Sequence, residues 1–123
     1  LTLHMMDNYE PAYCVGKTFH KLNKNTETGN AWGDWDVDRF TAEDSAFGFI
    51  VMKNGAVIYL KSSWALNMAD PREAITTICG DKAGAAILDG QELNVKPEQA
   101  AVVTRILEGI YKSQQTGKPY YFD

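Results

Sequence analysis

The sequence predicts an α+β fold: a mostly antiparallel open sheet with helices packed on one face, the other face being used for oligomerisation. Two observations support this prediction. Two β-rich apolar runs flank Asn54-Gly55, a dipeptide that is the strongest short hairpin signal. A long amphipathic segment, 97–116, follows a series of predicted strands, and this order of elements is typical of α+β domains.

The predicted hairpin joins strands at 44–53 and 56–66. Because strand side chains alternate between faces, Phe47, Phe49 and Val51 point to one side of the first strand. The other side carries Ala46, Gly48, Ile50 and Met52. Both faces are therefore apolar and both require cover. One face can take a helix, whereas the other needs a second domain or a second subunit.

The remaining elements follow from local signals. In order, they are a helix end at 1–8 and strands at 12–22, 72–79, 85–88 and 119–122. Turns are predicted at Asp70-Pro71 and at 80–84. Nothing resembling an N-cap precedes the first apolar residues, which indicates a chain that is a fragment of a larger one.

The clearest element is a helix from Pro97 to about Thr116. Proline suits the first helical position, and Gly117 is the expected C-terminal stop. Apolar residues recur with i, i+3, i+4, i+7 and i+8 spacing, which predicts a stripe packed on the sheet. The stripe consists of Val103, Ile106, Leu107, Ile110 and Tyr111.

Length and composition exclude several classes of protein. The 123 residues suit one domain, predicted over 1–123. The net charge is −4 and the basic residues are scattered, which argues against nucleic acid as a partner. No apolar run approaches the ~20 residues of a membrane span, and no signal peptide opens the chain. Cys14 and Cys79 fit a reducing, cytoplasmic location, with a disulfide between them as the alternative.

An acidic segment has part of a calcium-binding pattern. Asp34, Asp36 and Asp38 have the 1-3-5 spacing of a calcium loop. However, Arg39 occupies the sixth position, where glycine is expected, and Ser45 the twelfth, where glutamate is expected. The segment is therefore interpreted as a solvated acidic loop.

Three tryptophans are notable. Two interpretations of Trp32 and Trp35 remain open. In the first, they anchor their glycine-containing loop or a subunit contact; in the second, they line a ligand cleft. In the second case Trp32, Asp34 and Trp35 are the candidate substrate-binding residues. Trp64 is expected in the core or, with Phe47, Phe49 and Val51, in the oligomer interface.

The residues of this chain compose no complete catalytic, cofactor or metal site. Cys14 and His20 share a strand face, but six residues at ~3.3 Å each separate them by roughly 20 Å, too far for a nucleophile–base dyad. His4 and His20 would bind a metal only with carboxylates from elsewhere. The sequence has no Gly-x-Gly-x-x-Gly turn, no phosphate-binding P-loop and no Gly-x-Ser-x-Gly elbow. We therefore expect no catalytic, cofactor-binding or metal-binding residue here.

Six stretches, in this order, resemble the C-terminal half of the Gfo/Idh/MocA oxidoreductases. They are GNAWGDWD at 29–36, EDSAFGFI at 43–50, NGA at 54–56, SSWALN at 62–67, ICGDKAG at 78–84 and VKPEQA at 95–100. The tail at 110–118 also resembles the usual end of such chains. The resemblance covers nearly the whole chain, and six pieces in the right order are specific.

The resemblance implies an N-terminal Rossmann domain that binds NAD or NADP and a C-terminal α+β domain. The sheet of the second domain shapes the substrate site and packs against a partner subunit. This chain would be that C-terminal domain, acting with its missing Rossmann domain on a sugar- or polyol-type substrate and forming a homo-oligomer through its sheet face. By itself it would bind no nicotinamide cofactor and would not be catalytic. The alternative is a free-standing, non-catalytic dimeric binding or assembly module.

The chain also departs from the family pattern. The Rossmann half and its lysine are absent, and the family's catalytic segment would lie before Leu1, so no catalytic residue is carried over. His4 falls past that segment and does not inherit its role. At 87–90 the chain joins two regions that family members usually separate by several tens of residues.

Overall fold

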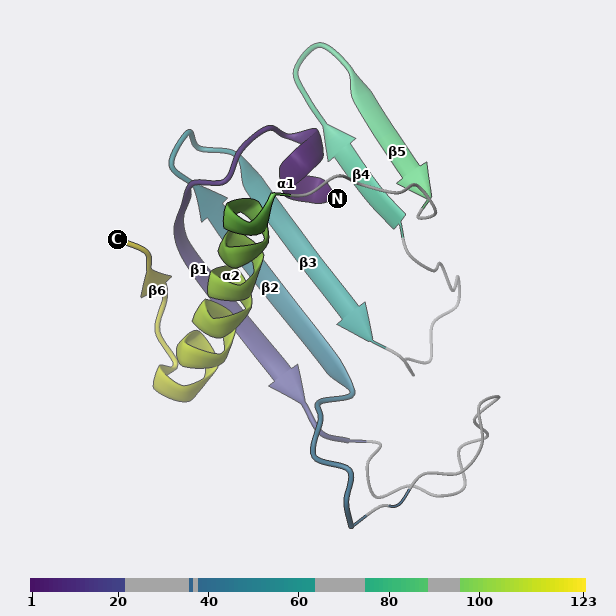
Figure 1. Ribbon diagram of the computed structural model, residues 1–123, viewed down its shortest axis with the longest axis vertical. Helices are drawn as coiled ribbons and strands as arrows, with labels where there is room; N and C mark the ends of the chain where they lie inside the picture. The colour runs from purple at the N-terminus through teal and green to yellow at the C-terminus, as the bar shows by residue number, and fades with distance from the viewer. Residues whose placement is uncertain (22–35, 37, 64–74, 89–95) are drawn as a thin grey trace.

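The computed structural model describes residues 1–21, 36, 38–63, 75–88 and 96–123 (Figure 1). Within them the chain forms an antiparallel sheet of order β3-β2-β1-β6, a separate antiparallel hairpin of β4 and β5, and one main helix, α2. The bounds are α1 Thr2–Met5, β1 Pro11–Phe19, β2 Ser45–Met52, β3 Val57–Ser63, β4 Ile75–Cys79, β5 Gly84–Leu88, α2 Pro97–Thr116 and β6 Tyr120–Tyr121. The predicted α+β class is confirmed.

The hairpin of β2 and β3 forms where the sequence predicts it. Its loop closes with two backbone hydrogen bonds: Met52 N–H donates to Ala56 O at 2.8 Å, and Gly55 N–H donates to Met52 O at 2.9 Å. Gly55 adopts φ of +88°, which a residue with a side chain rarely tolerates, and the Asn54 side chain accepts from the Ala56 N–H at 3.1 Å. The pairing of Val51 with Val57 then fixes the register of the two strands.

Helix α2 covers one face of the sheet, lying across β1 and β2 in Figure 1. It begins at Pro97, where the Gln99 side chain accepts from the backbone N–H of Lys96 at 3.1 Å, and it ends before Gly117 in the left-handed conformation at φ +67°. The predicted apolar stripe is only partly correct. Ile106 and Ile110 are buried, whereas the other three stripe residues, Val103, Leu107 and Tyr111, are exposed. The buried row continues instead through Gly109 and Ser113, because the helix lies close to the strands there.

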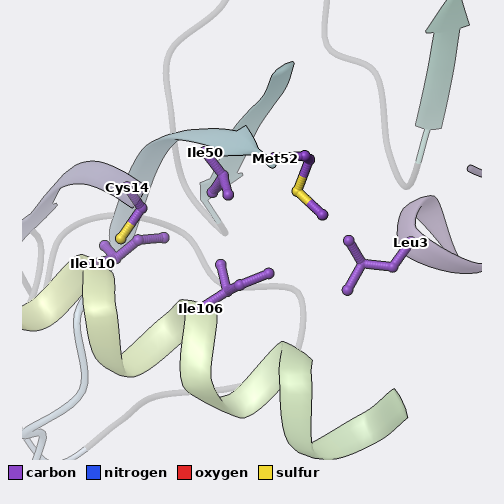
Figure 2. Packing of buried hydrophobic residues seen from close by; sticks show 6 residues of the cluster. All are labelled: Leu3, Cys14, Ile50, Met52, Ile106 and Ile110. Carbon is purple, nitrogen blue, oxygen red and sulfur yellow. The ribbon is translucent and has the colours of Figure 1, made fainter. Parts of the chain in front are cut away.

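The core lies between α2 and the inner face of the sheet. Figure 2 shows side chains from four elements meeting there, and the six buried apolar residues are Leu3, Cys14, Ile50, Met52, Ile106 and Ile110. Ile50 and Met52 come from the predicted inner face of β2. Each fully buried side chain of this size contributes roughly 1.5–3 kcal/mol before conformational entropy is subtracted.

Side chains of α2 also hydrogen-bond to the backbone of β1 where β6 no longer pairs with it. The backbone pairs of β1 with β6 are Tyr13 with Tyr121 and Cys14 with Tyr120. Beyond them, Gly16 N–H donates to the Ser113 hydroxyl at 3.3 Å, and both the N–H and the hydroxyl of Thr18 donate to the Gln114 side-chain oxygen. Beyond the end of β6, side chains of α2 therefore provide the hydrogen-bond acceptors that a neighbouring strand would otherwise offer to β1.

Several predicted boundaries differ from the structure. Strand β1 ends at Phe19 instead of residue 22, because the Lys21 N–H donates to the Asp44 carboxylate and not to a neighbouring strand. The described part of β4 begins at Ile75, and residues 72–74 lie outside the described residues. Both cysteines are free thiols, so the alternative of a disulfide is wrong. Within the described residues, no helix has the length and apolarity required to cross a membrane.

Candidate functional site

The sheet face opposite α2 carries a group of mostly apolar side chains. The strand register places Val15, Phe49 and Tyr59 in one row across β1, β2 and β3. All three are exposed, Phe49 at 46% and Tyr59 at 68% of their full surface. A row of large apolar side chains in the middle of a sheet is normally buried, so the exposure of this row is unusual for an isolated domain.

Neighbouring rows extend this surface. On one side, the register aligns Tyr13, Val51 and Val57, and Tyr121 of β6 lies next to Tyr13 with ring centroids 5.4 Å apart. On the other side, Phe47 lies between two lysines, Lys17 of β1 and Lys61 of β3. We call this surface the open face; its members are Tyr13, Val15, Lys17, Phe47, Phe49, Val51, Val57, Tyr59, Lys61 and Tyr121.

The structure brings three of the four predicted interface residues together. Phe49 is exposed at the centre of the open face, whereas Phe47 and Val51 beside it are half-buried. The fourth, Trp64, lies outside the described residues. The sequence prediction missed Val57 and Tyr59, although the alternation of 56–66 contained the signal that would have placed both on this face.

The predicted substrate-binding residues, Trp32, Asp34 and Trp35, also lie outside the described residues. Asp36, next to them in sequence, is exposed and accepts hydrogen bonds from the backbone N–H groups of Asp38 at 3.0 Å and Arg39 at 3.3 Å. This carboxylate therefore stabilises a local turn.

The structure separates the other chemically reactive side chains. Cys14 is fully buried under α2, and burial raises the pKa of its thiol to about 11. His20 lies beyond the end of β1, is exposed, and has Nδ1 3.2 Å from the carbonyl oxygen of Ala42. Cys79 is exposed on the separate hairpin. In the part of the chain that the structure describes, no group of three or more His, Cys, Asp or Glu side chains is placed to hold a metal ion.

A buried carboxylate connects the end of β1, the beginning of β2 and the end of β3. Asp44, just before β2, is only 2% exposed. Its carboxylate accepts from the backbone N–H of Lys21 and, at 2.8 Å, from the hydroxyl of Ser45. Its own N–H donates to Phe19 O at 2.9 Å, and its carbonyl oxygen accepts from the Ser63 hydroxyl at 3.1 Å. Sequence reasoning missed this residue, because three of its partners, Phe19, Lys21 and Ser63, lie about twenty residues away in the chain.

A pocket of about 180 Å³ adjoins Asp44. It is lined by Glu43, Asp44, Ser45, Ala46, Ser62 and Ser63. The Tyr111 hydroxyl of α2 donates a hydrogen bond to the Glu43 carboxylate, and this bond holds the pKa of Glu43 below its ordinary value of 4.5. The side of the molecule at the ends of β1 and β3 thus offers fixed carboxylates and hydroxyls.

Comparison with known proteins identifies one related segment. Over 70 residues the chain is 37% identical to the D-glucoside 3-dehydrogenase of Escherichia coli (strain K12). The segment covers 57% of this chain but 20% of that protein, so the match spans about a fifth of the relative's length. No protein-family model matches the chain. The chain therefore contains a region related to a dehydrogenase.

Proposed function

We propose that this chain is the C-terminal substrate-shaping and oligomerisation domain of a Gfo/Idh/MocA-like, NAD(P)-dependent oxidoreductase that acts on a sugar- or polyol-type substrate. In this proposal residues 1–123 form one domain of a longer cytoplasmic protein. The domain contributes part of the substrate site and a subunit interface. The hydride transfer itself requires a Rossmann domain that this sequence does not contain.

The observation that carries the proposal is the 70-residue segment of 37% identity to a dehydrogenase of D-glucosides. Its description as a dehydrogenase agrees with the family that the six sequence stretches resemble. The α+β architecture, with a helix on one sheet face and an apolar second face, is the arrangement expected of such a domain. The open face supports the oligomerisation part of the proposal, because covering it would remove Val15, Phe49 and Tyr59 from water together.

The nicotinamide cofactor implied by the family does not fit the residues of this chain. Dinucleotides bind at a glycine-rich turn between a strand and a helix, where backbone N–H groups meet the pyrophosphate. The sequence has no Gly-x-Gly-x-x-Gly turn, and its long helix begins with Lys96-Pro97. We therefore assign the cofactor to the missing domain and derive no catalytic step from this chain.

Sedimentation velocity tests the oligomerisation role. We expect the chain to be a dimer, and Phe49→Asp, which places a charge in the centre of the open face, to give a monomer. Leu107→Asp is a matched control, because Leu107 is 45% exposed, against 46% for Phe49, but lies on α2 away from the open face. A monomeric wild type at high concentration, or equal dissociation by both variants, would contradict the proposal.

The intact mass of the protein in its source cells separates the proposal from the free-standing module. A mass near 13.7 kDa would favour a dimeric binding or assembly module. The mass of a two-domain dehydrogenase would support the proposed domain.

A further inference from the structure

We propose that the pocket beside Asp44 binds neighbouring hydroxyl groups of one sugar-type polyol. The pocket-forming polar residues are Glu43, Asp44, Ser45, Ser62 and Ser63. The choice of a polyol rests on the proposed function, because that function supplies the class of ligand. The pocket itself follows from the geometry alone.

The wall of the pocket is fixed before any ligand arrives. Asp44 is held by hydrogen bonds to Lys21, Ser45, Phe19 and Ser63, so the ends of β1 and β3 and the beginning of β2 are joined at this point. Pairing of Ser45 with Ser63, and of Ala46 with Ser62, sets the spacing between the two strands that flank the pocket. Such preorganisation lowers the entropy lost when a ligand binds.

The chemistry of the wall favours a ligand rich in hydroxyl groups. Carboxylates only accept hydrogen bonds, whereas serine hydroxyls both donate and accept them. Adjacent hydroxyls of a sugar ring can donate to Glu43 while accepting from Ser62, since the Ser63 hydroxyl already donates to the carbonyl oxygen of Asp44. The Tyr111 hydrogen bond stabilises the charged form of Glu43, so this acceptor is maintained at neutral pH. The Glu43 carboxylate also repels phosphate and other anions.

The size of the pocket limits what it holds. At about 180 Å³ it is smaller than the ~300–1,000 Å³ of sites that enclose a drug-sized molecule. It therefore fits the edge of one sugar ring, with the rest of the ligand outside.

The test is an NMR titration of the ¹⁵N-labelled 123-residue chain with methyl β-D-glucoside. We expect saturable shifts of the Ser45, Ser62 and Ser63 amides. Glu43→Gln should weaken this binding about tenfold, because it removes a charged acceptor, yet glutamine still accepts from Tyr111 and preserves the fold. Glu108→Gln is the matched control: it removes the same charge from an exposed ion pair with Lys112 on α2 and should leave binding unchanged. Dispersed spectra of both variants verify folding.

Choline chloride is titrated in parallel, because an organic cation also suits the Glu43 carboxylate. Saturation of these amides by choline and not by the glucoside would overturn the proposal. Glucoside shifts confined to residues away from the pocket would overturn the site while leaving the proposed sugar-related function intact. Absence of any saturable shift with the glucoside would also overturn the site. The proposed function is tested independently by the oligomeric state and by the intact mass.

Discussion

Ile110 of α2 lies directly against the backbone of Gly16 in β1. A Cβ atom on Gly16 would be 2.4 Å from Ile110 Cγ2, closer than real side chains approach, and 3.0 Å from Ile110 Cβ, which is also unusually close. The tip of the same isoleucine reaches β2, where a Cβ on Gly48 would be 2.7 Å from Ile110 Cδ1. The helix therefore approaches the sheet closely because two adjacent strands carry glycine, paired with each other, beneath one side chain.

This contact predicts that Gly16→Ala is more harmful than Gly48→Ala. The new methyl group at position 16 meets atoms close to the helix backbone, which cannot move without shifting α2. At position 48 it meets the end of a side chain, which can change rotamer. We expect a loss of about 2–3 kcal/mol in the free energy of unfolding for Gly16→Ala and about 1 kcal/mol for Gly48→Ala, measured by urea denaturation.

A double-mutant cycle identifies the cause. Ile110→Ala removes the atoms that clash, so Gly16→Ala should cost at least about 1 kcal/mol less in that background. An unchanged cost would show that the effect arises from the backbone of β1 and not from the contact with Ile110.

The hairpin and the helix α2 could be predicted from the sequence because their signals are local. Asn54 and Gly55 are adjacent, and the apolar spacing of α2 repeats within a few residues. The buried side of α2 could not be predicted in the same way. Val103 and Leu107 have the same spacing as Ile106, yet they are exposed, since burial depends on where the helix crosses β1 and β2.

In the candidate sites, too, features with a local sequence signal could be predicted, whereas features that depend on distant residues could not. Alternation placed Phe49 on an outer face, and the structure agrees. In contrast, the burial of Asp44 depends on Lys21 and Ser63, each about twenty residues distant, so no local pattern could reveal it. An aspartate in a polar sequence is ordinarily expected at the surface.

The hydrogen bond between Tyr111 and Glu43 predicts a pH-dependent contribution to stability. Folding lowers the pKa of Glu43, so the contribution is present above pH 4.5 and is lost as the pH falls through the lowered value. The same hydrogen bond raises the pKa of Tyr111 above 10.0, so the contribution is also lost at strongly alkaline pH. Tyr111→Phe should cost less than about 1 kcal/mol at pH 7, because both groups are partly solvated, and should cost less at pH 3 than at pH 7.

Urea denaturation of wild type and Tyr111→Phe at pH 3, 5 and 7 measures this difference. Tyr59→Phe removes a hydroxyl from the open face and should leave the free energy of unfolding unchanged at each pH. A Tyr111→Phe effect of equal size at pH 3 and pH 7 would contradict the assignment to a charged Glu43.

The two cysteines should differ sharply in reactivity. Cys14 is buried and has a pKa of about 11, so at pH 8 only about one thiol in a thousand would be ionised even if reagent reached it. Cys79 is exposed on the hairpin of β4 and β5. Iodoacetamide should therefore add one group to the native chain, at Cys79, and two groups in urea. Rapid native alkylation of Cys14, detected by mass spectrometry of peptides, would show that α2 separates readily from the sheet.

The contact between Gln114 and Thr18 gives a prediction in which two substitutions of similar size have opposite outcomes. One side-chain oxygen of Gln114 accepts from both the backbone N–H and the hydroxyl of buried Thr18. Gln114→Leu keeps the approximate shape but removes the acceptor, which leaves two buried donors unsatisfied and should cost about 1–3 kcal/mol by urea denaturation. Gln114→Glu restores an acceptor oxygen and should retain most of the stability. Hydrogen exchange gives a local measure, because the Thr18 amide should lose protection in the leucine variant and keep it in the glutamate variant. Equal loss in both variants would mean that packing of the Gln114 stem, and not its oxygen, secures this edge of β1 to the helix.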